Sequence, residues 1–377
     1  MINQVSIRSA SITTNLGRLL AYSGSSSEAV ILAPEMNTSP HEGYLKQYCR
    51  YQPLLEAPSE LESTSYISEA IAVRSFRDAT ISPRLGVVRQ GRGPIVTETT
   101  KAIRFRFSDW MQQLNSEEFR RIPADYISGN YVYSAHGDYH VYGHFLFETM
   151  CTAYLLNSLL VEGRASLVVP KYGSTWYSQL LDLLGIPITA RYRLSGDATR
   201  FENLILSSTC DSRNTFYPNG VMKSVSEVLK QRAGAAKEYP CTERLYLTRR
   251  GSSNTARRDY VEDEALSEML SKLGFQTLNP ATMSIVEQIR LFSRAQIIVG
   301  IHSSAFANLM FSPSSTLVID ILPSHWVNAG GMFTKNITNL YGQKYIYLVA
   351  ESFKEGDGYS CTLAPELVYN TVRQFFD

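Results

Sequence analysis

The sequence predicts an α/β protein with two domains, and three observations support this fold class. The chain has 377 residues, more than one ordinary core needs, and its hydrophobic content of 44% and charged content of 19% are those of a globular protein. Short apolar runs alternate with stretches of helical periodicity. In the C-terminal part this alternation repeats with short connections. Because parallel strands need crossover helices, the repetition indicates a doubly wound parallel sheet.

Residues 1–235 are expected to form an N-terminal α/β domain, in which residues 1–60 are an irregular extension. Apolar runs between turn residues predict strands at Ile71–Val73, Leu85–Val88, Ile95–Thr97, Ala165–Val169, Ile188–Ala190 and Leu204–Leu206. Apolar residues at helical spacing predict helices at Tyr142–Leu160, Ser174–Leu184 and residues 220–232. The small, polar stretch Ala233–Cys241 contains a proline and is expected to link the two domains.

Residues 240–350 are expected to form a C-terminal Rossmann-like domain. Its strands are predicted at Leu245–Thr248, Phe275–Leu278, Gln296–Val299 and Thr316–Leu322, and its helices at Glu262–Leu273, Ser284–Arg294 and Ser303–Met310. The first helix is expected to end at Gly274 and to bury Ala265, Leu266, Met269, Leu270 and Leu273. Residues 351–377 are expected to form a tail that ends in a helix over Pro365–Phe376.

Composition and charge disfavour several classes of protein. The formal net charge of +1 offers no general field for a polyanion, so nucleic acid is not an expected partner. Five scattered cysteines without a CxxC pair predict neither a disulfide framework nor a zinc site and fit a reducing compartment. The N-terminus lacks the layout of a signal peptide, and the apolar stretch Phe145–Val161 is too interrupted to be a transmembrane segment. A cytoplasmic protein is expected, with peripheral contact at the inner membrane face left open.

The segment Ile297–Asn308 predicts a phosphate site. A buried strand is expected to end at Gly300, and a helix is expected to begin near Ser303. Small residues at the turn would let a ligand approach the backbone, and the first N–H groups of a helix bind anions. His302 stands at the end of the strand, where it could contact a diphosphate. The alternative is an ordinary strand–turn–helix with a serine N-cap.

Arginines follow the first C-terminal strand. Arg249, Arg250, Arg257 and Arg258 lie in a loop that should open at the same sheet edge as His302, where they could neutralise a diphosphate leaving group. A solvated basic loop is the alternative reading.

Two roles are possible for Glu287. It could accept hydrogen bonds from ribose hydroxyls, or it could close a capping box with Ser284.

A second candidate site lies in the N-terminal half. His144 and Glu148 are four residues apart and would share one face of a helix, so either could act as a general base for an acceptor hydroxyl while the other positions it. Asp138 is a further candidate base. His140 and His144 have a spacing that also suits zinc, but no third ligand is evident. The alternative is that these polar side chains have only a structural role and form hydrogen bonds where a helix begins.

No metal site is expected. The sequence lacks a DxD motif at a strand end, and the acidic run Glu262–Glu264 is expected to be solvated at a helix start, where it complements the helix dipole. GxSxG, P-loop and complete GxGxxG motifs are missing as well, which disfavours hydrolase, P-loop and dinucleotide-binding functions.

Several motifs occur in an order and spacing that resemble glycosyltransferase family 61. In the C-terminal part they are Leu245–Arg250, Ala256–Arg258, Glu262–Glu264, Leu273–Phe275, Ser284–Gln288, Ala295–Gly300, His302, Asn308, Phe311 and Pro313. Upstream they are His144–Glu148, Leu181–Gly185 and Phe201–Leu206. The resemblance covers about residues 65–350.

The resemblance implies a GT-B architecture, with two Rossmann-like domains facing a central cleft, and inverting transfer from a nucleotide-sugar, often a UDP-sugar. Carried over by position, Arg249, Glu287, His302 and Asn308 would belong to the donor site, and His144 and Glu148 to the acceptor side. The neighbouring Arg250, Arg257, Ser303 and Ser304 complete the predicted donor site. Neither a metal nor a cofactor is expected beside the nucleotide-sugar co-substrate.

Three positions depart from the family pattern. The glycine-rich segment that follows the histidine is replaced by Ser303–Ala307, Val261 stands where asparagine is common, and Asp320 where glutamate is common. The expected function is an inverting glycosyltransferase with a glycan or lipid-linked glycan acceptor, in the synthesis of a bacterial surface or capsular polysaccharide. The alternative is a non-catalytic nucleotide- or glycan-binding subunit that retains the fold, which the substituted segment favours.

Overall fold

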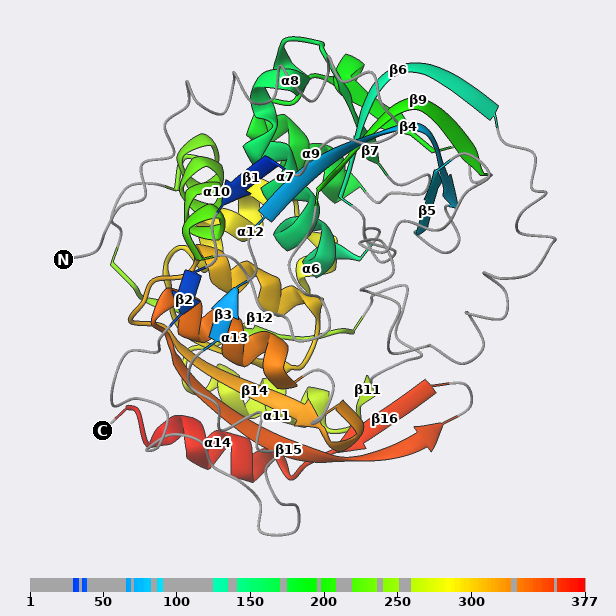
Figure 1. Ribbon diagram of the computed structural model, residues 1–377. Helices are drawn as coiled ribbons and strands as arrows, with labels where there is room; N and C mark the ends of the chain where they lie inside the picture. The colour runs from blue at the N-terminus through cyan, green and yellow to red at the C-terminus, as the bar shows by residue number, and fades with distance from the viewer. Residues whose placement is uncertain are drawn as a thin grey trace. The chain divides into compact units, whose positions relative to one another are not determined.

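The computed structural model describes residues 30–33, 36–38, 66–68, 71–82, 87–90, 125–134, 141–169, 175–194, 198–207, 219–235, 240–250, 259–326, 331–355 and 358–376. The chain divides into two compact units. Unit 1 comprises Met1–Asn37 and Ile67–Val228, and unit 2 comprises Thr38–Tyr66 and Leu229–Asp377. Each unit contains a seven-stranded mixed sheet with parallel strands at its centre (Figure 1). The predicted α/β fold class is therefore confirmed.

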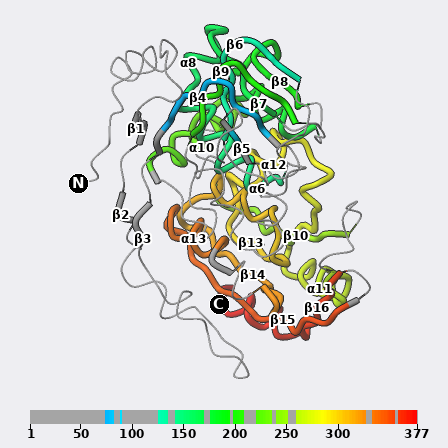
Figure 2. Tube along the Cα trace, turned by 45° about the vertical axis from the view of Figure 1, so that its right-hand side comes forward, coloured from blue at the N-terminus to red at the C-terminus, as the bar shows by residue number. Residues whose placement is uncertain are grey.

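The sheet of unit 2 is doubly wound. Its strands are β10 (Glu243–Leu247), β11 (Asp259–Tyr260), β12 (Gln276–Leu278), β13 (Ala295–Ile301), β14 (Leu317–Pro323), β15 (Lys344–Glu355) and β16 (Gly358–Thr362). They lie in the order β11-β16-β15-β14-β13-β10-β12, and the five strands from β15 to β12 are parallel. In Figure 2, β10, β13, β14 and β15 follow one another across this unit. Numbered along the chain, these five strands have the order 2-1-3-4-5, so the winding reverses between β10 and β13.

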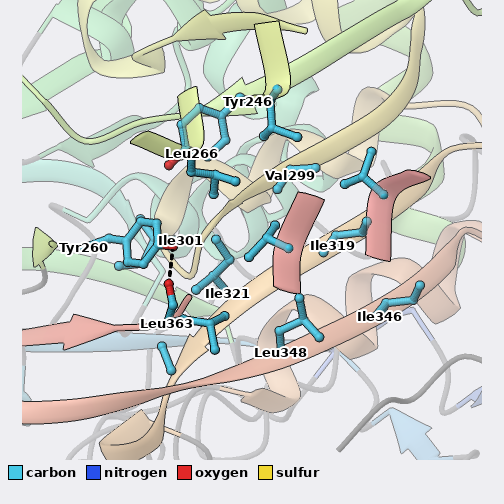
Figure 3. Packing of buried hydrophobic residues seen from close by; sticks show 14 of the residues in the cluster. Tyr246, Tyr260, Leu266, Val299, Ile301, Ile319, Ile321, Ile346, Leu348 and Leu363 are labelled. Atoms are coloured by element: carbon cyan, nitrogen blue, oxygen red, sulfur yellow. Dashed lines mark hydrogen bonds between the residues drawn. The ribbon is translucent and has the colours of Figure 1, made fainter. Parts of the chain in front are cut away.

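Helices accompany this sheet. They are α11 (Asp263–Ser271), α12 (Ile285–Phe292), α13 (Gly331–Tyr341) and α14 (Pro365–Arg373), with 3₁₀ helices η5 (Pro280–Thr282), η6 (Ser304–Phe311) and η7 (Ser324–Trp326). Helices α11 and α14 contact each other, whereas α12 and α13 both contact η6. Figure 3 shows Leu266 of α11 packed with Val299, Ile319 and Ile321 from the centre of the sheet. The Tyr260 hydroxyl closes this core by donating to the Leu363 carbonyl at 2.7 Å.

The sheet of unit 1 combines a parallel and an antiparallel part. Its strands are β1 (Val30–Ala33), β4 (Ile71–Ser82), β5 (Val87–Gln90), β6 (Asp125–Tyr133), β7 (Ser166–Val169), β8 (Arg191–Arg193) and β9 (Thr199–Ser207). The order is β1-β4-β9-β6-β7-β8, and β5 pairs with β4. Strands β9, β6, β7 and β8 are parallel, and β1, β4 and β5 extend them in antiparallel fashion. The parallel strands have the order 3-2-1-4 from β8 to β9, so this sheet reverses at β6.

The helices of unit 1 follow the parallel strands. They are α6 (Tyr142–His144), the π-helix η2 (Phe145–Thr149), α7 (Met150–Leu155), α8 (Asn157–Val161), α9 (Thr175–Leu184) and the 3₁₀ helix η3 (Ile188–Ala190). The boundary between the units falls within the next helix, α10 (Asn219–Arg232). A separate two-stranded sheet pairs β2 (Met36–Thr38) with β3 (Tyr66–Ser68).

Several predicted elements differ from the observed ones. Ile188–Ala190 is a 3₁₀ turn instead of a strand, because Pro187 precedes it and the strand β8 begins only at Arg191. Ala265 is exposed and not buried, whereas Leu266 and Leu270 carry the core contact of α11. The predicted strand Ile95–Thr97 lies outside the described residues. Strand β6 was not predicted, because Gly129, at φ +104, interrupts the alternation of apolar and polar residues along it.

Candidate functional site

The carboxyl ends of β10 and β13 flank the switch point of unit 2, the position at which open α/β sheets bind ligands. Leu247 ends β10 and pairs with Gly300 of β13. A Cβ atom at position 300 would lie 2.8 Å from the Leu247 Cβ and 3.0 Å from its carbonyl oxygen. Glycine is therefore needed for the close approach of the two strands. Strand β13 ends at Ile301, one residue after the predicted end at Gly300. The expectation that small residues at this turn let a ligand approach the backbone stays a prediction.

The amino end of η6 supplies backbone donors at this switch point. Ser303 is its N-cap, in an extended conformation and without a side-chain cap. The first bond of the helix runs from the Phe306 N–H to the Ser303 carbonyl at 3.1 Å. The N–H groups of Ser304 and Ala305 precede this bond and have no partner within the helix, which suits them to bind an anion. Ser303 itself is buried, and Ser304 is partly exposed.

His302 is held rigidly beside these donors. Its Nδ1 lies 3.0 Å from Oδ2 of the fully buried Asp320 and 3.3 Å from the Thr334 hydroxyl. The Tyr345 hydroxyl donates to the same Asp320 oxygen at 3.1 Å. Because the Asp320 carboxylate accepts a hydrogen bond from Nδ1–H, Nε2 is the nitrogen suited to face a ligand. The imidazole is only 4% exposed and packs against the ring of Phe306, so little of it can be reached.

Asn308 is fully buried in η6 and links that helix to the loop before α12. Its amide donates to Oε1 of Gln288 at 2.8 Å, and Gln288 in turn donates to the carbonyls of Pro280 and Met283. In this structure Asn308 therefore positions neighbouring segments. The donor contact that the family resemblance implies for it stays a prediction.

The two adjacent arginines after β10 have different environments. Arg249 is half-buried, and this burial lowers the pKa of its guanidinium while the charge of Asp259 raises it. Arg250 is more exposed, and its Nε lies 2.6 Å from Oδ2 of Asp263. The guanidinium of Arg250 is thus engaged by Asp263, and that of Arg249 interacts with the charge of Asp259. The donor contacts of both arginines stay predictions.

Asp263 is the centre of a buried network, so the expectation that the whole acidic run is solvated was wrong. Its carboxylate accepts hydrogen bonds from the Tyr246 hydroxyl at 2.6 Å and the Thr248 hydroxyl at 2.7 Å, besides the contact with Arg250. Burial, and then the negative charge of Asp263, raise the pKa of the Tyr246 phenol. The preceding Glu262 accepts from the Thr362 hydroxyl, and only Glu264 is exposed. The contacts of Asp263 with Thr248 and Arg250 therefore hold the start of the loop that follows β10.

Glu287 takes part in the capping box of α12. The Ser284 N–H and hydroxyl donate to its Oε2 at 2.8 and 2.6 Å, and the Glu287 N–H donates to the Ser284 hydroxyl at 3.2 Å. These hydrogen bonds lower the pKa of Glu287. The capping alternative is therefore realised, and a contact with ribose stays a prediction.

The loop that carries the arginines starts and ends on different sides of the switch point. It leaves β10 after Leu247 and re-enters the sheet at β11, and β13, β14, β15 and β16 lie between these two strands. Strand β15 continues past the end of β14, and β16 and β11 pair alongside this extension. Arg257, Arg258 and Asp138 lie outside the described residues.

In unit 1, His144 and Glu148 follow β6, the strand at which that sheet reverses. His144 Nδ1 lies 2.9 Å from Oε1 of Glu148. The His144 side chain is 28% exposed, whereas that of Glu148 is fully buried. Glu148 belongs to the π-helix η2, a type of turn often found at functional sites. A buried carboxylate that orients a partly exposed imidazole is an arrangement suited to general base catalysis.

Within the described residues, no group of three or more His, Cys, Asp and Glu side chains is arranged to hold a metal ion. None of the helices in the same part of the chain is both long enough and apolar enough to cross a membrane.

The fold and the candidate sites define a class of protein. It is an α/β protein with backbone donors suited to an anion at the switch point of one sheet and a His–carboxylate pair after the switch-point strand of another. Residues 142–319 match the family model described as Glycosyltransferase 61, so the chain carries a domain of this glycosyltransferase family. The match includes His144, Glu148, Arg249, Glu287 and His302 and confirms the family resemblance. No curated protein matches the chain.

Proposed function

We propose that this chain is an inverting, metal-independent glycosyltransferase that moves a sugar from a UDP-linked donor to a hydroxyl of a glycan or lipid-linked glycan acceptor. The observation that carries the proposal is the combination of Arg249 and the backbone donors of η6 at one switch point. Synthesis of a surface polysaccharide at the cytoplasmic face of the membrane is the role that we propose for it.

The donor diphosphate would bind at the end of β13. The N–H groups of Ser304 and Ala305 and the guanidinium of Arg249 supply donors for its oxygens without a metal ion. His302 is oriented beside these donors by Asp320, and its Nε2 donates to the diphosphate when both ring nitrogens carry a proton. Because these groups are held in place before the reaction, they can stabilise the charge that develops on the leaving UDP.

The acceptor would be activated by His144. Its Nε2 takes the proton of the acceptor hydroxyl while the oxygen attacks the anomeric carbon, and the bond from that carbon to the diphosphate breaks. Glu148 accepts from Nδ1, orients the ring and balances the imidazolium that forms. A single displacement of this kind inverts the anomeric configuration. Assigning the acceptor base to one unit and the donor to the other is the division of roles in a GT-B architecture, which we propose for this chain.

Calorimetry with UDP and product analysis with a panel of UDP-sugars and glycan acceptors test the proposal. Arg249→Ala is expected to weaken UDP binding roughly tenfold to a hundredfold, because it removes charge-assisted hydrogen bonds. His144→Ala is expected to keep wild-type UDP affinity and to lose turnover. Arg373→Ala, which removes an exposed charge on α14, is the matched control and should change neither property.

Full activity in both Arg249→Ala and His144→Ala would overturn the assignment of the sites. UDP binding by the wild type without turnover on any acceptor would instead favour the non-catalytic binding subunit.

A further inference from the structure

Four aromatic residues form a cluster around the segment that carries His144. The Trp176 cluster consists of Tyr142, Phe145, Trp176 and Tyr177. Trp176 is the second residue of α9, which follows β7, the strand next to β6. Its ring meets those of Tyr142 and Phe145 edge to face, with centroids 5.4 and 5.2 Å apart. Edge-to-face contacts of this length are favourable, so the cluster is a defined packing unit.

The inner members of the Trp176 cluster are buried and its outer members are partly exposed. Phe145 is fully buried, and Tyr177 is buried with its hydroxyl accepting from Arg193 at 2.6 Å. Trp176 and Tyr142 retain partial exposure. The indole is held by three rings, because Tyr177 also contacts it edge to face at 5.9 Å. A ligand that stacks on it would therefore lose little additional side-chain freedom.

Two residues of the Trp176 cluster share one helical segment with the proposed base His144. Tyr142 lies two residues before His144, and Phe145 directly follows it, so two of the three rings that contact Trp176 flank the imidazole in the chain. The carboxylate partner of His144 lies in the same helical segment. An acceptor group that reaches His144 therefore has a partly exposed aromatic surface within the same packing unit.

We propose that Trp176 and Tyr142 form a subsite for the pyranose ring that carries the acceptor hydroxyl. This inference rests on the proposed function. A pyranose has an apolar face of C–H groups and a rim of hydroxyls, so it can stack on an aromatic ring while one hydroxyl turns to a base. A serine or threonine hydroxyl on a peptide offers no such face. The acceptor class is therefore a sugar hydroxyl.

Intrinsic fluorescence provides a direct test, because the chain has only three tryptophans: Trp110, Trp176 and Trp326. The full chain is titrated with a panel of neutral tetrasaccharides of glucose, galactose and N-acetylglucosamine. At least one glycan is expected to change the emission of the wild type, Trp110→Phe and Trp326→Phe, but not that of Trp176→Phe. Calorimetry should show that Trp176→Phe still binds this glycan, whereas Trp176→Ala binds it roughly tenfold more weakly because the stacking surface is lost.

Tyr126→Ala is the matched control, because Tyr126 is a 55% exposed aromatic residue on β6 that contacts Arg200 instead of the Trp176 cluster. It should leave glycan affinity unchanged. Equal glycan affinity in Trp176→Ala and wild type overturns the subsite, and so does a panel in which no glycan binds. Because UDP binding is measured separately, either result is distinguishable from a failure of the donor site.

Discussion

At the residue scale, two adjacent arginines show how the partners of a side chain decide its role. Arg249 and Arg250 look equivalent in the sequence, yet the guanidinium of Arg250 is bound to Asp263, which also accepts from Tyr246 and Thr248. The Arg250 N–H donates to the Thr248 hydroxyl at 3.0 Å, so the same network fixes the backbone from which Arg249 projects. Arg250 therefore has a positioning part in this structure, and its predicted contact with the donor stays a prediction.

Asp263→Ala is expected to destabilise the protein by about 2 kcal/mol or more, because it leaves two buried hydroxyl donors without their acceptor and Arg250 without its close ion pair. Urea unfolding measures the change. Glu264→Ala is the control: Glu264 is exposed, and its carboxylate lies 3.7 Å from Arg250, so its loss should cost no more than about 0.5 kcal/mol. Equal effects of the two substitutions would contradict the assigned role of Asp263.

At the element scale, the start of α12 depends on an ionised carboxylate. The hydrogen bonds from Ser284 lower the pKa of Glu287 in the folded protein below its value in the unfolded chain. A group with a lowered folded pKa stabilises the protein at pH values above its unfolded pKa, about 4.3 for Glu. This stabilisation is lost as the pH falls through the folded pKa.

Glu287→Gln is therefore expected to lower the Tm at pH 7, and the difference from wild type should shrink as the pH falls from about 4.3, the unfolded pKa of Glu, through the lower folded pKa. Thermal unfolding between pH 7 and pH 3 measures it. Glu268→Gln, at an exposed position on α11, serves as the control and should follow the wild type throughout. A Tm difference for Glu287→Gln that does not shrink between pH 7 and pH 3 would mean that geometry, and not charge, is responsible for the capping effect.

The long helix predicted after β6 is also informative at this scale. Its periodicity is continuous in the sequence, but the structure has a π-helical turn at Phe145–Thr149 and a break at Leu156. A π-turn inserts an extra residue and shifts the side chains that follow. Here it accompanies the contact between His144 and Glu148, which the spacing of four residues had already predicted.

At the scale of the whole molecule, each unit repeats the same plan. The parallel strands reverse their winding, and a His–carboxylate pair includes a histidine that follows a strand beside the reversal. The pairs are His144–Glu148 after β6 in unit 1 and His302–Asp320, with His302 directly after β13, in unit 2. Strand ends at a reversal diverge and leave room for a ligand, which is why sheets of this kind share the position of their sites. In both pairs the carboxylate is fully buried, so its part is to orient the imidazole.

The proposed donor site relies on Arg249 and backbone N–H groups for charge neutralisation. Transfer activity is therefore expected to stay unchanged in excess EDTA. Initial rates measure this, with calcium-saturated EDTA as a control for ionic effects. Loss of activity that manganese restores would show that a divalent cation takes part and would overturn the metal-independent mechanism.

The sequence by itself determined the features that depend on neighbouring residues. Apolar periodicity located β10, β13, β14, α11 and α12, and the type and spacing of Ser284 and Glu287 specified a capping box, because these features arise within a few residues. The placement of His302 at a strand end followed in the same way. The sequence also identified the family resemblance, because the family is specified by a long series of motifs in a fixed order.

Only the tertiary structure decided which of these residues share contacts. The pairing of Asp320 with His302, the burial of Asn308 against Gln288, and the need for glycine opposite Leu247 all depend on the register of strands and the packing of helices. Such contacts join residues whose separation along the chain bears no relation to their distance in space. Periodicity can place a side chain on one face of a helix or strand, but it does not identify the residue that the side chain contacts there.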